Sequence, residues 1–144
     1  MRAVLPAALL LCLASTGVAQ QPRPYTEGPV NNFSYIRTKP GMFDKYMEYL
    51  GGNYKRVMEA QKKAGVILDY TVYTSPGATE NDWDVLLVTT YKNMAALDNL
   101  QDRTDPIMAS ALNQNREQAN QASAGRGPMR DLVGTRLVRE LILK

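Results

Sequence analysis

Apolar and polar positions change their period several times along the chain, and each change predicts a new element. Residues 30–38 have the β-branched and aromatic composition of a strand. Residues 42–64 place apolar side chains at helical spacing on one face. Two further strands are predicted at 66–75 and 82–92, joined as a hairpin by the polar turn 76–81.

The second half of the chain predicts a helix and a last strand. Asn93 is a good N-cap for a short helix, and Thr104-Asp105-Pro106 resembles a second helix start. Residues 113–123 contain almost no large apolar side chain, so we expect them to be a solvated or frayed helix. Residues 131–143 return to a strand pattern.

This order of elements predicts an α+β fold of the ferredoxin-like, split βαβ kind. Such a domain has a four-stranded antiparallel sheet with its helices on one face. The continuous apolar run Val85–Val88 indicates that both faces of the third strand are covered. We therefore expect a second copy of the chain to cover the bare face, as in a symmetric homodimer.

Three short segments carry a resemblance to a known superfamily. They are Tyr35–Phe43 at the first strand-to-helix junction, Trp83–Val88 in the third strand and Asn93–Leu97 at the opening of the second helix. The chain resembles the dimeric α/β-barrel superfamily, which contains antibiotic-biosynthesis-type monooxygenases and many uncharacterised proteins. The likeness covers about residues 30–100 and the last strand, and the matching motifs are structural.

The resemblance implies several functions. Members of the superfamily include cofactor-free oxygenases, haem-degrading enzymes and proteins with no demonstrated chemistry. The haem-degrading branch typically uses a histidine as iron ligand. This chain has no histidine, so haem degradation is not carried over.

The N-terminal region predicts export. Residues 1–19 combine a basic start, an apolar run too short to span a bilayer, and small residues at Gly17 and Ala19. We expect a signal peptide cleaved after Ala19, a flexible leader over 20–29 because of its prolines, and one domain over 30–144. The mature protein should be periplasmic or secreted, with a bacterial origin favoured because no disulfide is possible, and should not stay inserted in a membrane.

Composition excludes several chemistries. The chain has no histidine, and its one cysteine, Cys12, lies in the predicted signal peptide. Histidine bases, cysteine nucleophiles and the usual ligands of zinc, copper and iron–sulfur clusters are therefore missing. We expect no cofactor and no transition metal. After loss of Arg2, 16 basic residues face 14 acidic ones, which argues against nucleic-acid binding.

Aromatic residues on the predicted strands are candidates for a ligand pocket. Tyr35, Tyr73 and Trp83 are large and amphipathic, and suit the wall of a pocket for a flat aromatic ligand. The alternative is that they pack in the core or in a dimer interface.

Charged residues on the strands are the other candidates. Arg37 and Arg136 lie on strands expected to be neighbours and could bind a carboxylate or phenolate, or form salt bridges, for example with Glu140 or Asp69. Asp69 and Asp84 could act as bases if burial raised their pKa, or could be polar residues at a wet sheet edge.

Two functions follow from these features. The first is binding of a small apolar or aromatic molecule between sheet and helices, without chemistry of its own. The alternative is a cofactor-independent monooxygenase acting on a phenolic or quinone-like substrate, for which the protein supplies a dry pocket, donors and a base. The sequence leaves open whether the protein is an enzyme.

Overall fold

The computed structural model of the protein describes residues 21–76, 79 and 82–144. The strands are β1 (Tyr25–Thr38), β2 (Asp69–Thr74), β3 (Val85–Tyr91) and β4 (Arg130–Leu143). The helices are α1 (Phe43–Tyr49), a π segment (Leu50–Tyr54), α2 (Lys55–Lys63), a 3₁₀ turn (Met94–Leu97), α3 (Leu100–Leu112) and α4 (Arg116–Ala124).

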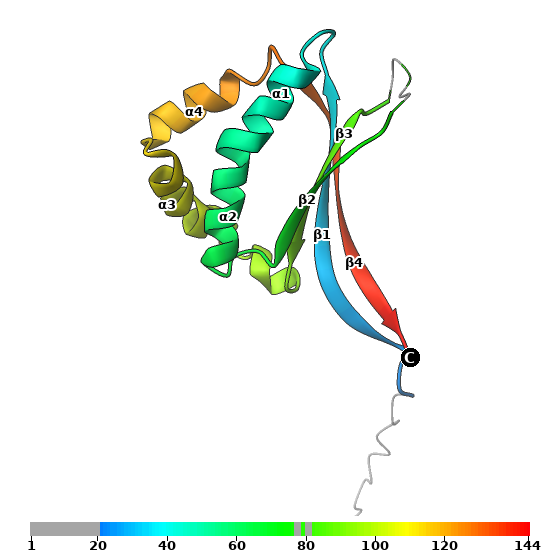
Figure 1. Cartoon of the computed structure of the whole chain (residues 1–144). Coiled ribbons are helices and arrows are strands. Elements are labelled where there is room, and N and C mark those ends of the chain that lie inside the picture. The colour runs from blue at the N-terminus through cyan, green and yellow to red at the C-terminus, as the bar shows by residue number, and fades with distance from the viewer. Residues whose placement is uncertain (1–20, 77–78, 80–81) are drawn as a thin grey trace, which may run out of the picture.

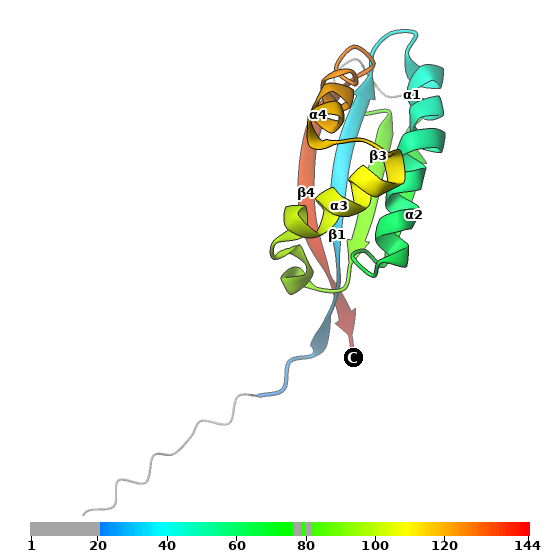
Figure 2. The same ribbon diagram turned by 90° about the vertical axis from the view of Figure 1, so that its left-hand side faces the viewer.

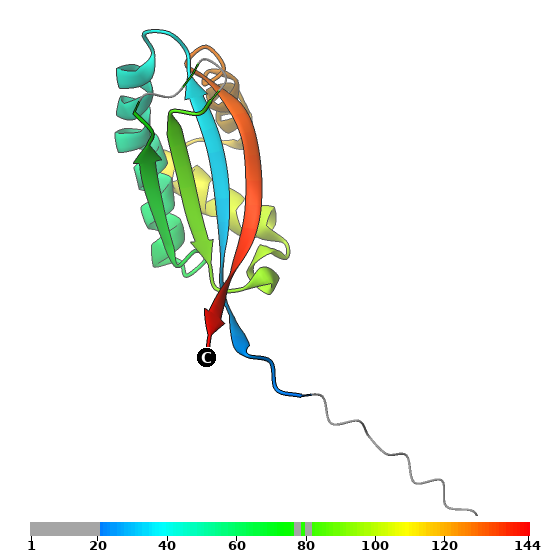
Figure 3. The same ribbon diagram turned by 90° about the vertical axis from the view of Figure 1, so that its right-hand side faces the viewer.

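The four strands form one sheet in the order β2-β3-β1-β4, and every neighbouring pair is antiparallel. All helices lie on one face of this sheet (Figures 1 and 2). No helix of the described residues covers the opposite face, here called the bare face, and Figure 3 shows its strands with no helix in front of them. The predicted ferredoxin-like, split βαβ fold is therefore confirmed.

The core lies between the sheet and the helices and has two centres. They are built from side chains of β1 and β3 and from the segments that pack on them: Val30, Val66, Ile67 and Tyr91 in one, and Ile36, Tyr46, Leu50 and Val85 in the other. Since Val30, Ile36, Val85 and Tyr91 point toward the helices, the residues that alternate with them point to the bare face.

The helix predicted over 42–64 changes its form at Gly51-Gly52. The chain passes through the π segment there and continues as α2. Apart from the helix's own backbone and the chain neighbours, a Cβ at either glycine would meet no atom within 4 Å, so no neighbouring segment packs closely on them. The π turn absorbs the weak helix formers without ending the helix.

The prediction of a flexible leader over 20–29 is wrong for the second half of this segment, because β1 begins at Tyr25. The pairing of β1 with β4 shifts register between Glu27 and Val30. Pro29 lies within this irregularity, where its missing N–H interrupts no regular ladder. A proline-rich segment is thus accommodated at the extended end of the strand.

Two expectations for the second half of the chain also change. Pro106 does not open a helix but lies inside α3, which begins at Leu100. Part of the 113–123 segment forms α4, which has a capping box between Asn115 and Gln118 and no buried side chain, as a solvated helix should.

The bare face of the sheet is rich in apolar side chains. Phe33 pairs with Val88, and Tyr35 pairs with Leu86, so all four lie on this face. The predicted covering of the third strand on both faces does not come from the described residues of this chain. An apolar sheet face without a cover is typical of an interaction surface.

The predicted signal peptide, residues 1–19, lies outside the described residues. Within the described ranges, no helix combines the length and apolar character needed to cross a bilayer.

Candidate functional site

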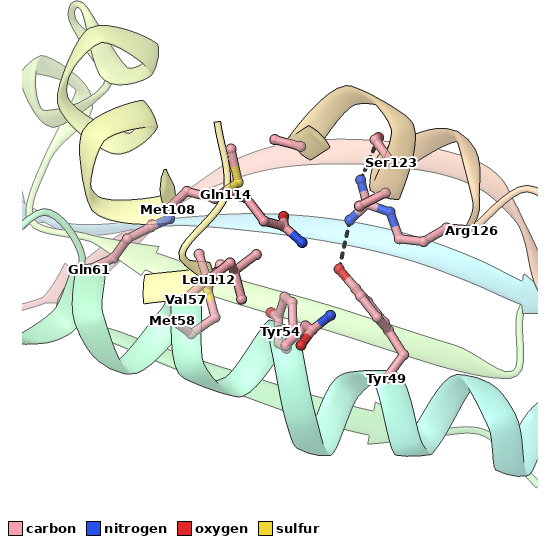
Figure 4. A pocket seen from close by; sticks show the side chains of 13 residues that line it. Tyr49, Tyr54, Val57, Met58, Gln61, Met108, Leu112, Gln114, Ser123 and Arg126 are labelled. Atoms are coloured by element: carbon pink, nitrogen blue, oxygen red, sulfur yellow. Dashed lines mark hydrogen bonds between the residues drawn. The ribbon is translucent and has the colours of Figure 1, made fainter. Parts of the chain in front are cut away.

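A cavity of about 220 Å³ lies on the helix-covered side of the molecule (Figure 4). One side is formed by α1, the π segment and α2, and the other by α3, α4 and the loops after them. Most of its lining is apolar and comes from small or flexible side chains: Val57, Met58, Met108, Leu112, Ala119 and Ala122. Such a lining suits an apolar molecule.

The size of the cavity limits what it can hold. A dry apolar cavity of about 150 Å³ accommodates benzene. The larger cavity here fits one aromatic ring, or an aliphatic group of that size, with a short polar arm.

Three buried polar atoms on the lining residues have no hydrogen-bond partner within the described part of the chain. They are Tyr54 Oη, Gln114 Oε1 and Arg126 Nε. Leaving a buried polar group unpaired costs about 1–3 kcal/mol, so such groups usually meet water or a ligand. Two of the three groups can donate and one accepts, which gives the cavity specific polar contacts.

Arg126 is held in place by α1 and α4 (Figure 4). Its Nη1 donates to Tyr49 Oη over 2.8 Å, and its Nη2 donates to Ser123 Oγ over 2.5 Å. The guanidinium carbon lies 5.6 Å from the centre of the Tyr49 ring, a cation–π distance. The guanidinium is thus oriented by a phenol and a hydroxyl, both uncharged.

Tyr54 is a hydrogen-bond donor at neutral pH. Burial raises its pKa to about 12, and the nearby Thr89 side chain only partly opposes this rise. Thr89 does not have the geometry of a hydrogen-bond partner for Tyr54 Oη. A phenol with this pKa keeps its proton near pH 7 and cannot serve there as a base.

We expect Tyr54 to make the protein sensitive to alkali. Its pKa is near 10 in the unfolded chain and about 12 in the folded one, so the stabilisation from the neutral phenol is complete below pH 10. It is lost as pH rises from 10 toward 12. The free energy of unfolding, measured with denaturant across this window, should fall less steeply in Tyr54→Phe than in the wild type. Equal slopes would contradict a raised pKa at this residue.

The site residues predicted from the sequence lie elsewhere. Tyr35 pairs with Leu86, which pairs with Tyr73, so both tyrosines lie on the bare sheet face. Trp83 packs on Tyr35, with ring centres 5.7 Å apart. These aromatic residues do not line the cavity, which lies between helices and not between sheet and helices as predicted.

The two arginines are on the same bare face. Arg136 pairs with Phe33, and Arg37 is an even number of residues from Tyr35 on β1. Their strands are neighbours, as predicted. Arg37 Nε donates to the Asp82 backbone carbonyl over 2.9 Å, and Arg136 borders a shallow hollow with Tyr35 and Trp83.

Of the two alternatives for Asp69, the structure supports the polar residue at the sheet edge and not the buried base. Its carboxylate is exposed on the edge strand β2 and accepts a hydrogen bond from Lys62 Nζ at 2.8 Å, which lowers its pKa. Asp84 accepts hydrogen bonds from the backbone N–H and the hydroxyl of Thr38. It therefore has a structural role in joining β1 to the start of β3.

The cavity residues were missed for identifiable reasons. Tyr54, Val57 and Met58 belong to the apolar helical stripe, which a sequence reading assigns to the core. Arg126 lies between two glycines in what reads as a loop. The useful signal was the small-residue composition of α4, because alanines at Ala119 and Ala122 leave space under the helix.

Within the described ranges, no three acidic side chains gather into a group that could hold a metal ion. The cavity lining contains no Asp or Glu. Its polar chemistry is therefore hydrogen bonding by amide and phenol groups and the positive charge of Arg126.

No protein-family model and no curated protein sequence matches the chain. Several solved structures are similar to this chain in their fold. HapK from Hahella chejuensis is 11% identical with a TM-score of 0.52, and the match covers 77% of this chain and 91% of HapK. The protein SO0527 from Shewanella oneidensis is 14% identical with a TM-score of 0.51, and the match covers 82% of this chain and 96% of SO0527.

A nipsnap family protein with unknown function from Agrobacterium tumefaciens is 12% identical with a TM-score of 0.50, covering 81% of this chain and 89% of its own. At these identities the comparisons support the ferredoxin-like architecture and nothing finer. The fold implied by the resemblance of Tyr35–Phe43 and Trp83–Val88 is in agreement with them.

Proposed function

We propose that this protein binds a small, mainly apolar molecule in the cavity between its two groups of helices, α1 with α2 and α3 with α4. The observation that carries the proposal is the combination of an apolar cavity of about 220 Å³ with three unpartnered buried polar atoms on its lining residues. An apolar space favours an apolar ligand, and the unpaired polar atoms favour one with a polar group at a fixed place.

The alternative predicted from the sequence, a cofactor-independent monooxygenase, has weaker support. That chemistry needs a base to form the substrate anion, unless the substrate is already ionised. Tyr54 is protonated at neutral pH, and the lining offers no carboxylate. Binding without turnover is therefore the function that this cavity supports best.

We also propose that the protein is a homodimer joined through the bare face of its sheets. Seven of the twelve exposed large hydrophobic side chains among the described residues are on β4: Leu132, Val133, Leu137, Val138, Leu141, Ile142 and Leu143. Leu137 and Val138 are consecutive and both exposed, so this edge strand is apolar on both sides. Exposed apolar edge strands are normally covered, and a second copy covers both sheets at once.

Export of the protein is a further part of the proposal. It is supported by the signal-peptide pattern of residues 1–19 and by the absence of cysteine after Cys12. The ligand would then be met in the periplasm or outside the cell.

Binding is tested by titrating the purified protein with one-ring compounds that differ in their polar group. Calorimetry should show one saturable site per chain for at least one compound, with a dissociation constant below about 1 mM. Oxygen uptake with that compound should stay at the rate without protein. An absence of saturable binding across the set would contradict the proposal, and oxygen consumption that depends on the protein would favour the monooxygenase.

A further inference from the structure

Arg126 holds a positive charge beside the cavity that no carboxylate of the described residues neutralises. Within the described ranges, the salt bridges join Lys39 to Asp131, Lys62 to Asp69 and Arg139 to Glu27, and none includes Arg126. The hydrogen-bond partners of Arg126 are uncharged hydroxyl groups, and its buried Nε has no partner. The guanidinium therefore keeps both its charge and one free donor.

Arg130 follows Arg126 by four residues, and its backbone N–H donates to the Arg126 carbonyl over 3.2 Å. Burial raises the pKa of Tyr46, and the charges of Arg130 and Arg126 both oppose this rise. The Nε of Arg130 is also buried without a partner. Asp84 has the weakest of these effects on Tyr46 and is already bonded to Thr38.

The surroundings compensate this positive charge only in part. The C-terminal end of α4, just before Arg126, carries about half a negative charge from its carbonyl groups. The full charge of the Arg126 guanidinium exceeds that partial charge. The end of the cavity near Arg126 is thus electropositive, whereas the rest of its lining is mainly apolar.

We infer that the ligand is a small apolar carboxylate whose carboxylate group binds Arg126 and whose apolar part lies against Val57, Met58 and Leu112. This inference rests on the proposed binding function. A carboxylate accepts charge-assisted hydrogen bonds from a guanidinium and neutralises it, which an uncharged ligand cannot do. One ring with a short acidic arm matches both the volume and the polarity of the cavity.

The inference is tested with a matched pair of probes, 3-phenylpropionate and 3-phenylpropan-1-ol, which differ only in the acidic group. We expect the carboxylate to bind the wild type about tenfold tighter or more, as one charge-assisted hydrogen bond implies. The ratio of the dissociation constants, alcohol over carboxylate, should fall close to one in Arg126→Gln. In Arg126→Lys, which keeps the charge, this ratio should be partly retained. Arg116→Gln removes the same charge from the start of α4, away from the cavity lining, and should leave the ratio unchanged.

A second measurement needs no variant. Raising the ionic strength should weaken binding of the carboxylate and leave binding of the alcohol unchanged, because salt screens only the charged pair. If both probes bind with equal affinity, the carboxylate inference is wrong and the binding function stands. A preference that survives in Arg126→Gln, or an equal response to salt, would also overturn the inference. If neither probe binds, the binding function fails together with it.

Discussion

Replacing Val138 by glutamate should convert the protein from a dimer to a monomer. Val138 pairs with Asn31 on the bare face of the sheet and is 39% exposed in the single chain. In a monomer the new carboxylate would remain in water, so the fold should survive. In a dimer joined through this face it would be buried, which costs several kcal/mol. We expect the dissociation constant of the dimer to rise about a hundredfold or more.

Sedimentation at micromolar concentration measures this change, and circular dichroism checks the fold. Met47→Glu is the matched control, because Met47 is 37% exposed but lies on α1, on the opposite side of the sheet. This variant should remain dimeric. A wild type that sediments as a monomer would contradict the proposed interface, and so would a Val138→Glu protein that associates as tightly as the wild type.

Filling the cavity should abolish ligand binding. Ala119 is partly buried on α4 and lines the cavity. In Ala119→Phe the added ring is about the size of benzene, which by itself fills a cavity of about 150 Å³. We expect affinity for a one-ring ligand to fall at least about fiftyfold, or more than 2 kcal/mol, when measured by calorimetry.

Ala124→Phe provides the control for this experiment. Ala124 is on the same helix, is exposed and does not line the cavity. Its variant should bind the ligand within about a factor of two of the wild type, as surface substitutions usually do. If both variants bind like the wild type, the ligand site is not this cavity.

The order and type of the elements could be predicted because each has a strong local period. The apolar stripe of 42–64 and the β-branched runs at 66–75 and 82–92 required no tertiary information. The antiparallel pairing of β2 with β3 then follows from their short connection, whereas the pairing of β1 with β3 and β4 joins distant parts of the chain. The π segment at Gly51-Gly52 could not be predicted in this way.

The exact start of β1 could not be predicted from local rules. Prolines argue against a strand, but Pro29 lies in a register irregularity that tolerates it. This irregularity depends on β4, more than 100 residues away in the sequence. Likewise, α3 includes Pro106 because the helix had already begun at Leu100, under the influence of its packing on α2.

The candidate site was misplaced because β1 carries large side chains on both faces. Phe33 and Tyr35 alternate with Ile36, and all three are large side chains, so alternation alone cannot show which of them faces the helices. The structure places Ile36 in the core and the two aromatic residues on the bare face. A cavity formed between helices from distant segments, such as Tyr54 and Arg126, leaves no short motif in the sequence.

The position of a bound ligand tests the central claim most directly. With ¹³C-methyl-labelled methionine, nuclear Overhauser effects can be measured between the methyl groups and the ring protons of 3-phenylpropionate. Met58 and Met108 line the cavity, whereas Met47 and Met94 are exposed outside it and serve as internal controls. We predict contacts from the ring to Met58 and Met108 and none to Met47 or Met94. Saturable binding with contacts only to Met47 or Met94, or with no contact to the cavity methionines, would contradict a ligand site in the cavity between the helices.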